Sequence, residues 1–102
     1  MTEIEIELSP RENSSKAVSV VEECCRLEGL TRKSKGTLSK FPGCIHWHYR
    51  KPGFNGTLEI TYWKKEPRLW YKVHPRRRGA WMIAVLPRLK AGIEEGLASP
   101  AV

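Results

Sequence analysis

The chain has 102 residues, 40% of them hydrophobic and 28% charged, which is the length and composition of one globular domain. No stretch approaches the roughly 20 apolar residues that span a bilayer, so we expect no membrane partner. Residues 1–8 have neither the basic start nor the apolar run of a secretion signal. We therefore predict a single domain over residues 1–102, with an ordered core of about 3–97 and a loose tail at 98–102.

The three cysteines indicate a reducing environment. Their number is odd, and Cys24 and Cys25 are sequence neighbours, which is poor geometry for a disulfide between them. Chains without disulfides are typical of reducing compartments, so the expected location is cytoplasmic. Cys24 and Cys25 lie on or near the apolar stripe of a predicted helix, and we interpret them as packing residues rather than nucleophiles.

The net charge of +7 is unevenly distributed along the chain. Residues 1–30 carry seven acidic and three basic side chains, whereas residues 31–90 carry fifteen basic side chains and only two acidic ones. One interpretation is an anionic partner for the middle of the chain. The other is that the acidic first part packs beside the basic part and neutralises it, and the sequence does not separate the two.

Residues 3–8 alternate between glutamate and apolar side chains, which is typical of a strand with one buried face. The next predicted element is a helix that begins at Asn13 or Ser14 and ends at Gly29. Its apolar positions recur at steps of three and four residues: Ala17, Val20, Val21, Cys24 and Leu27. Residues 31–43 predict an exposed basic loop with room for a short strand near residues 37–39.

Three runs that alternate with period two predict an antiparallel sheet. The runs are residues 44–50, 57–63 and 69–74, and the two connections between them are typical of hairpins. Closing the hairpins symmetrically places Arg50 opposite Thr57 and Trp63 opposite Arg68. One face is then wholly apolar or aromatic: Ile45, Trp47, Tyr49, Leu58, Ile60, Tyr62, Leu69, Tyr71 and Val73. The strand at 3–8 has three candidate partners, which are residues 44–50, residues 69–74 and another copy of the chain.

Residues 79–97 predict a closing helix, and Pro87 inside it predicts a kink or a restart near Leu86. The predicted fold is therefore an α+β two-layer sandwich with the element order β-α-β-β-β-α, in which both helices cover one face of the antiparallel sheet. The predicted core includes Trp47, Tyr49, Ile60, Tyr62, Tyr71, Val20, Leu86 and Leu89.

The opposite face of the sheet carries two tryptophans and three histidines, more than an ordinary solvent face does. Large exposed aromatic side chains commonly mark contact surfaces. In rows across the three strands the face reads Cys44/Trp63/Arg68, His46/Thr61/Trp70, His48/Glu59/Lys72 and Arg50/Thr57/His74.

The first functional hypothesis is weak binding of nucleic acid, with RNA or single strands preferred. Exposed aromatics stack on unpaired bases, and flanking cations hold phosphates. Three arginines lie just before the last helix, whose positive dipole end also attracts anions. The predicted nucleic-acid-binding residues are His46, His48, Trp63, Lys64, Lys65, Trp70, Lys72, Arg76, Arg77 and Arg78.

Three alternatives stay open. The face or an open strand edge could meet a protein partner or another copy of the chain, a hypothesis equal in weight to the first. For a metal, Cys44 and His48 lie about 13 Å apart by strand rise, so only an adjacent pair such as His46 and His48 would ligate together. A histidine-dependent ribonuclease would use His48 beside Glu59 and Lys72. We expect no catalysis, no metal and no cofactor, because no complete catalytic or ligand set can be assembled from the sequence.

The α-β-β-β-α order over roughly residues 14–97 resembles that of double-stranded-RNA-binding domains, which also carry a basic segment before the last helix. Their lysine-rich motif is replaced here by residues 76–81 (RRRGAW), and the first helix carries no matching signature. Small toxin ribonucleases have a related layout, with a histidine in a glycine-rich context that this chain lacks. The resemblance is one of layout, and layout does not determine function.

Overall fold

The three alternating runs form the centre of the sheet in a computed structural model, which describes residues 2–6, 8 and 14–98. They are β3 (Ile45–Arg50), β4 (Leu58–Trp63) and β5 (Arg68–Val73), and all neighbouring strands are antiparallel. Tyr49 lies opposite Leu58, and Trp63 lies opposite Arg68. The predicted register is therefore confirmed, and it buries the apolar face of the three strands except at Ile45, which is half-buried.

Two further strands complete a five-stranded sheet with the order β1-β5-β4-β3-β2. β1 (Thr2–Ile6) pairs with β5, which settles the partner that the sequence left open. β2 (Thr31–Gly36) pairs with β3 and occupies part of the predicted basic loop, whereas residues 37–39 are not a strand. All six residues of β2 are exposed, so this edge strand has no buried face and leaves no alternating pattern in the sequence.

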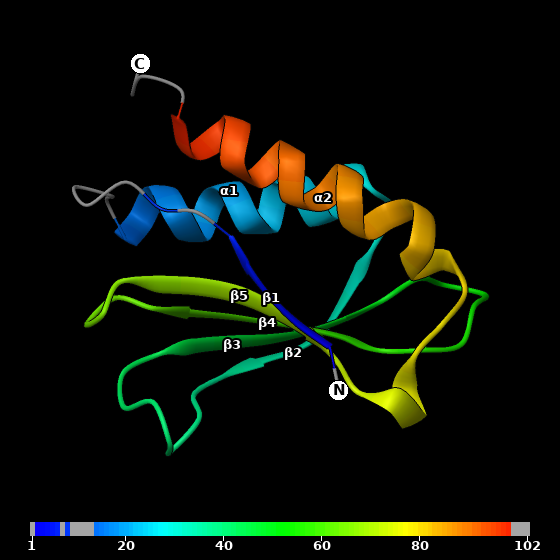
Figure 1. Cartoon of the computed structure of the whole chain (residues 1–102), viewed down its shortest axis with the longest axis horizontal. Coiled ribbons are helices and arrows are strands. Elements are labelled where there is room, and N and C mark those ends of the chain that lie inside the picture. The colour runs from blue at the N-terminus through cyan, green and yellow to red at the C-terminus, as the bar shows by residue number, and fades with distance from the viewer. Residues whose placement is uncertain (1, 7, 9–13, 99–102) are drawn as a thin grey trace.

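Two helices cover one face of this sheet (Figure 1), as predicted, and the fold is α+β. α1 (Ser14–Leu27) is followed by Gly29 with φ of 75°, and Leu27 is 69% exposed rather than part of the buried stripe. α2 (Trp81–Ala98) runs through Pro87 as one helix, without the restart near Leu86. A short 3-10 helix, η1 (Pro75–Arg77), precedes it. No helix in the described ranges is long and apolar enough to cross a membrane.

The core lies between the two helices and the inner face of the sheet. Six of the predicted core residues are buried: Trp47, Tyr49, Ile60, Tyr62, Tyr71 and Leu89. Val20 and Leu86 are half-buried and pack against that core. The predicted strand position Glu7, the Asn13 cap and residues 99–102 of the predicted tail lie outside the described residues. Ala98, predicted as the start of the loose tail, is instead the last residue of α2.

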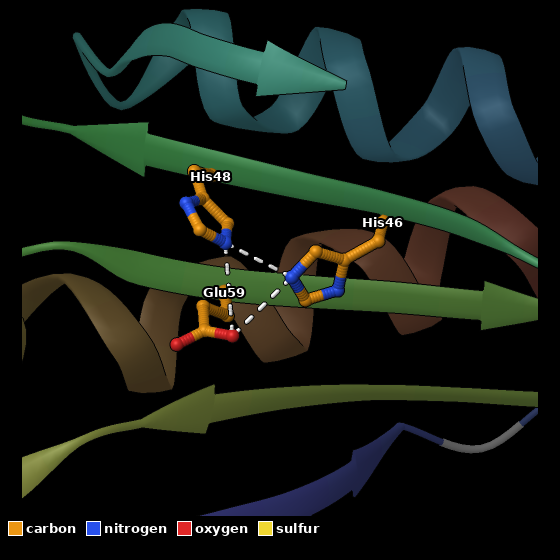
Figure 2. Close-up of side chains that lie close together, drawn as sticks. All are labelled: His46, His48 and Glu59. Atoms are coloured by element: carbon orange, nitrogen blue, oxygen red, sulfur yellow. Dashed lines mark hydrogen bonds and ion pairs between the residues drawn. The ribbon is translucent and has the colours of Figure 1, made fainter. Parts of the chain in front are cut away.

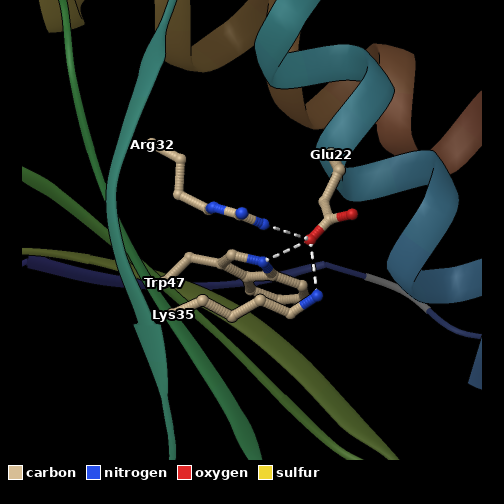
Figure 3. Close-up of polar contacts among 4 residues, drawn as sticks. All are labelled: Glu22, Arg32, Lys35 and Trp47. Atoms are coloured by element: carbon tan, nitrogen blue, oxygen red, sulfur yellow. Dashed lines mark hydrogen bonds and ion pairs between the residues drawn. The ribbon is translucent and has the colours of Figure 1, made fainter.

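Glu22 links the helical layer to the edge of the sheet (Figure 3). Its Oε2 accepts hydrogen bonds from Trp47 Nε1 at 3.0 Å and Lys35 Nζ at 2.8 Å, and lies 3.2 Å from Arg32 Nη1. Burial of the carboxyl opposes its ionisation, but the hydrogen bonds from Lys35 and Trp47 and the charges of Lys35 and Arg32 outweigh it and lower the pKa of Glu22. An acid from α1 thus compensates two bases of β2.

Replacing Trp47 tests the assignment of the two faces. Trp47→Ala should lower the free energy of unfolding by roughly 3–5 kcal/mol, because it empties a fully buried site between the sheet and the helices. Leu27→Ala, at an apolar residue that is 69% exposed, should change it by no more than about 0.5 kcal/mol. Urea denaturation of both variants gives the measurement, and an unchanged midpoint for Trp47→Ala would contradict the register.

The ion pairs of Glu22 should make stability depend on pH. Because its pKa is lower in the folded than in the unfolded protein, Glu22 contributes stability above the unfolded value of 4.5, and that contribution is lost as the pH falls through the folded pKa. The unfolding free energy should therefore decline less between neutral pH and about pH 3 in Glu22→Gln than in the unaltered protein. Parallel declines in the two proteins would show that these contacts do not stabilise the fold.

Candidate functional site

The outer face of the sheet has the predicted rows, but the segment between β2 and β3 folds back over part of it. The ring of Phe41 meets Trp63 and Trp70 edge to face, with ring centroids 5.1 and 5.0 Å apart. Trp63 Nε1 donates a hydrogen bond to the carbonyl of Pro42 at 2.9 Å. Residues 37–43 therefore form a wall along this face instead of a free loop.

Trp70 is only 3% exposed, which contradicts its predicted role as an exposed stacking residue. Phe41 covers it from one side, and the guanidinium of Arg68 lies 4.2 Å from its ring centroid. Strand alternation correctly places Trp70 on the outer face, but alternation says nothing about what a loop later covers. Phe41, a large apolar residue within a polar segment, was the sequence signal for that cover. Trp63 is half-buried and keeps part of its ring accessible.

Two histidines and a glutamate converge at the centre of the outer face (Figure 2). His46 and His48 are two residues apart on β3, and Glu59 lies directly across from His48 on β4. The Nε2 atoms of the two histidines are 3.0 Å apart. Glu59 Oε1 lies 3.2 Å from His46 Nε2 and 3.7 Å from His48 Nε2. Three potential metal ligands thus point at one another, where the sequence predicted only a pair.

His46 is the most constrained member of this cluster. Its ring is buried, and its Nδ1 makes a 2.7 Å hydrogen bond with Thr61 Oγ1, which lies opposite it on β4. Burial and the nearby charge of His48 lower the pKa of His46, and the carboxylate of Glu59 offsets this only in part. The imidazole is therefore neutral at neutral pH, which leaves one of its nitrogens as an acceptor.

A pocket of about 260 Å³ adjoins the cluster. Its wall comes from residues 38–41, which sequence reasoning did not connect with the histidines, and its floor comes from the sheet. Two lysines, Lys40 and Lys72, bring positive charge to its rim. The lining residues are Glu3, Leu38, Ser39, Lys40, Phe41, His46, Glu59, Thr61, Trp70 and Lys72.

The remaining predicted site residues lie at the two ends of β5. The turn before β5 and the segment after it lie at opposite ends of that strand (Figure 1). Lys64 and Lys65 are exposed in the turn, and Arg76, Arg77 and Arg78 are exposed in the segment. Within the described part of the chain, none of these five side chains has a carboxylate within 4.0 Å, and neither does Lys72 on the outer face between them.

Several other bases are neutralised by the acidic first part of the chain. Arg68 pairs with Glu3 and Glu5 of β1, and Arg88 of α2 pairs with Glu28 at 2.8 Å. Together with the contacts of Glu22, these pairs show that acidic residues of the first part of the chain pack beside basic residues of the middle and neutralise some of them. It does not extend to the cations that flank β5.

The contact between His46 and His48 does not fit two histidines that exchange acid and base roles. Two histidines that exchange acid and base roles in phosphate cleavage must lie on opposite sides of the phosphate, with room for it between their nitrogens. Here the two Nε2 atoms are 3.0 Å apart and contact each other directly. No phosphate fits between them in this arrangement.

Comparison with known proteins adds no further assignment. No family model matches the chain, and neither a curated protein nor a solved structure matches it.

The burial of Trp70 leads to a stability prediction. Trp70→Ala should lower the free energy of unfolding by roughly 3–5 kcal/mol, because the side chain is packed between Phe41 and Arg68 rather than presented to a ligand. Lys65→Ala, in the exposed turn before β5, should leave it within about 0.5 kcal/mol. Chemical denaturation of both variants tests this, and a loss below about 1 kcal/mol for Trp70→Ala would indicate an exposed ring.

Proposed function

We propose that this domain binds nucleic acid, preferring RNA or single strands, and that it holds phosphates with the cations at both ends of β5. The observation that carries the proposal is that the two ends of β5 carry runs of exposed basic side chains without an acidic partner among the described residues: Lys64, Lys65, Arg76, Arg77 and Arg78. Cations that are not neutralised within the protein are available to displace the counterions of a phosphate backbone.

The arginine segment is fixed to the sheet by backbone hydrogen bonds. Thr57 N donates to the carbonyl of Arg77 at 2.8 Å, and Arg77 N donates to the carbonyl of His74 at 2.9 Å. His74 Nδ1 also accepts a hydrogen bond from Arg76 N at 3.2 Å. Because its backbone is already ordered, this segment loses less conformational entropy when it binds an anion than a mobile basic tail would.

A close approach of two loops holds the same segment from the other side. A Cβ atom at Gly56 would lie 2.6 Å from Gly79 N, and one at Gly79 would lie 2.0 Å from the carbonyl of Asn55. Trp81 Nε1 donates to that carbonyl at 2.8 Å. The arginines therefore lie between the end of β5 and this anchor, shortly before the start of α2, where the helix dipole also favours an anion.

The two basic groups are separated by the length of β5, which is about 20 Å for six residues. A short single strand of a few nucleotides can cover this distance along the outer face. Lys72 lies along that path, and Trp63 offers the one partly accessible tryptophan ring on it among the described residues. Affinity should therefore come mainly from phosphates, with a smaller stacking contribution.

Association with another copy of the chain is the alternative. β2 is an open edge of the sheet, but it exposes Arg32, Lys33 and Lys35, and charged side chains of this kind typically prevent edge-to-edge pairing. The β2 edge therefore does not favour self-association.

The salt dependence of binding tests the proposal. If about four cations hold phosphates, the logarithm of the affinity for single-stranded RNA should fall with the logarithm of salt concentration at a slope of roughly −3. Arg76→Ala and Arg77→Ala should each flatten the slope by about 0.7, because each removes one phosphate contact. Trp63→Ala should weaken binding by about 1–3 kcal/mol without changing the slope. Fluorescence anisotropy with a labelled oligonucleotide at several salt concentrations gives all three values.

Arg26→Ala is the matched control for this experiment. It removes the same charge from α1, where Arg26 is exposed but paired with Glu23. Affinity and slope should stay as in the unaltered protein. An equal loss of affinity in Arg26→Ala and Arg76→Ala would indicate unspecific attraction by net charge. Absence of binding to any oligonucleotide at low salt would contradict the proposal and favour a protein partner.

A further inference from the structure

We propose that His46, His48 and Glu59 bind one zinc ion on the outer face of the sheet. The inference is independent of nucleic-acid binding, because it concerns the centre of that face and not the basic groups at the ends of β5. It rests on the positions of three ligand atoms that come from two neighbouring strands (Figure 2).

The spacing of the three atoms fits a tetrahedral ion. Zinc binds imidazole nitrogen and carboxylate oxygen at about 2.0–2.2 Å, so two of its ligand atoms lie roughly 3.3 Å apart. The two Nε2 atoms here are 3.0 Å apart, and Glu59 Oε1 lies 3.2 and 3.7 Å from them. The triangle is nearly equilateral, so one ion can lie about 2.1 Å from all three atoms, slightly out of their plane.

The hydrogen bonds within this cluster also favour a cation between the three ligand atoms. When His46 Nδ1 donates its proton to Thr61 Oγ1, the His46 Nε2 lone pair faces both His48 and the carboxylate of Glu59. A proton on His48 Nε2 can form a hydrogen bond with only one of the two facing atoms, His46 Nε2 or Glu59 Oε1. An ion at the centre of the triangle accepts all three lone pairs at once.

Two features of the surroundings are typical of metal sites, namely a hydrogen bond behind one ligand and an adjoining pocket. Thr61 fixes the orientation of the His46 ring through the 2.7 Å hydrogen bond, as residues behind the ligands of metal centres commonly do. His46 and Glu59 both line the pocket on the outer face, so an ion is accessible and keeps a fourth position for water or an anion. The lysines at the pocket rim, Lys40 and Lys72, favour an anion there.

The ligand types select zinc over harder ions. Magnesium and calcium bind mainly to oxygen, and the cluster offers two nitrogens and one carboxylate. Imidazole with carboxylate suits zinc in a tetrahedral arrangement. The cysteines do not contribute, since Cys24 packs against the core, Cys25 is buried in it, and Cys44, whose Sγ accepts a hydrogen bond from Leu38 N, does not belong to the cluster of close ligand atoms.

The test is a titration of the full, untagged chain with zinc chloride after treatment with a chelator. We expect one zinc ion per chain by calorimetry, and a higher unfolding midpoint with zinc than without it. Thr61→Val should weaken zinc binding about 10- to 100-fold, and Glu59→Gln and His48→Gln should weaken it at least as much. Circular dichroism without zinc verifies that each variant is folded.

Two controls make the result decisive. His74→Asn removes the histidine that lies outside the cluster, and it should leave the zinc affinity unchanged. Cobalt in place of zinc should give the visible bands of a tetrahedral centre without a thiolate charge-transfer band. The proposal would be overturned if the folded, unaltered chain did not bind zinc stoichiometrically. It would also be overturned if Glu59→Gln and His48→Gln bound zinc as tightly as the unaltered chain, or if cobalt gave a thiolate charge-transfer band.

Discussion

The pairing of β3, β4 and β5 constrains every other part of the molecule. Because successive side chains of a strand point to opposite faces, this register decides at once that Trp47 lies under the helices and that His46 lies on the other side. A shift of one residue would exchange the two. The helices, which cover the apolar face, and the cluster of His46, His48 and Glu59, which occupies the other, both depend on that single alignment.

This alignment could be predicted because apolar and polar residues alternate along three neighbouring runs of the sequence. Features that depend on contacts between distant segments could not be predicted. β2 carries no alternation, since both of its faces are exposed. The burial of Trp70 depends on Phe41, which arrives from a segment with no periodicity of its own. Glu59 was placed beside His48 from the sequence, but its contact with His46 runs diagonally between strands and requires side-chain positions.

Charge is organised by the same sheet. Acids of β1, of α1 and of the turn after α1 lie beside bases of β5, β2 and α2, which reduces internal repulsion in a chain with an acidic beginning and a basic middle. The compensation is incomplete among the described residues, since Lys33, Lys40 and Arg50 are exposed and have no carboxylate within 4.0 Å. The turn before β5 and the segment after it also keep their cations exposed, and there two or three such cations follow one another in the chain.

The contact between Gly56 and Gly79 joins two loops whose sequences lie more than twenty residues apart into one mechanical unit. The hairpin loop at residues 51–56 cannot change its path without displacing the backbone at residues 77–79, since Thr57 N is also bonded to the carbonyl of Arg77. Insertions in this loop would therefore alter the direction of the arginine side chains, although they leave every arginine in place. The turn at residues 64–67 has no such partner among the described residues and can vary in length independently.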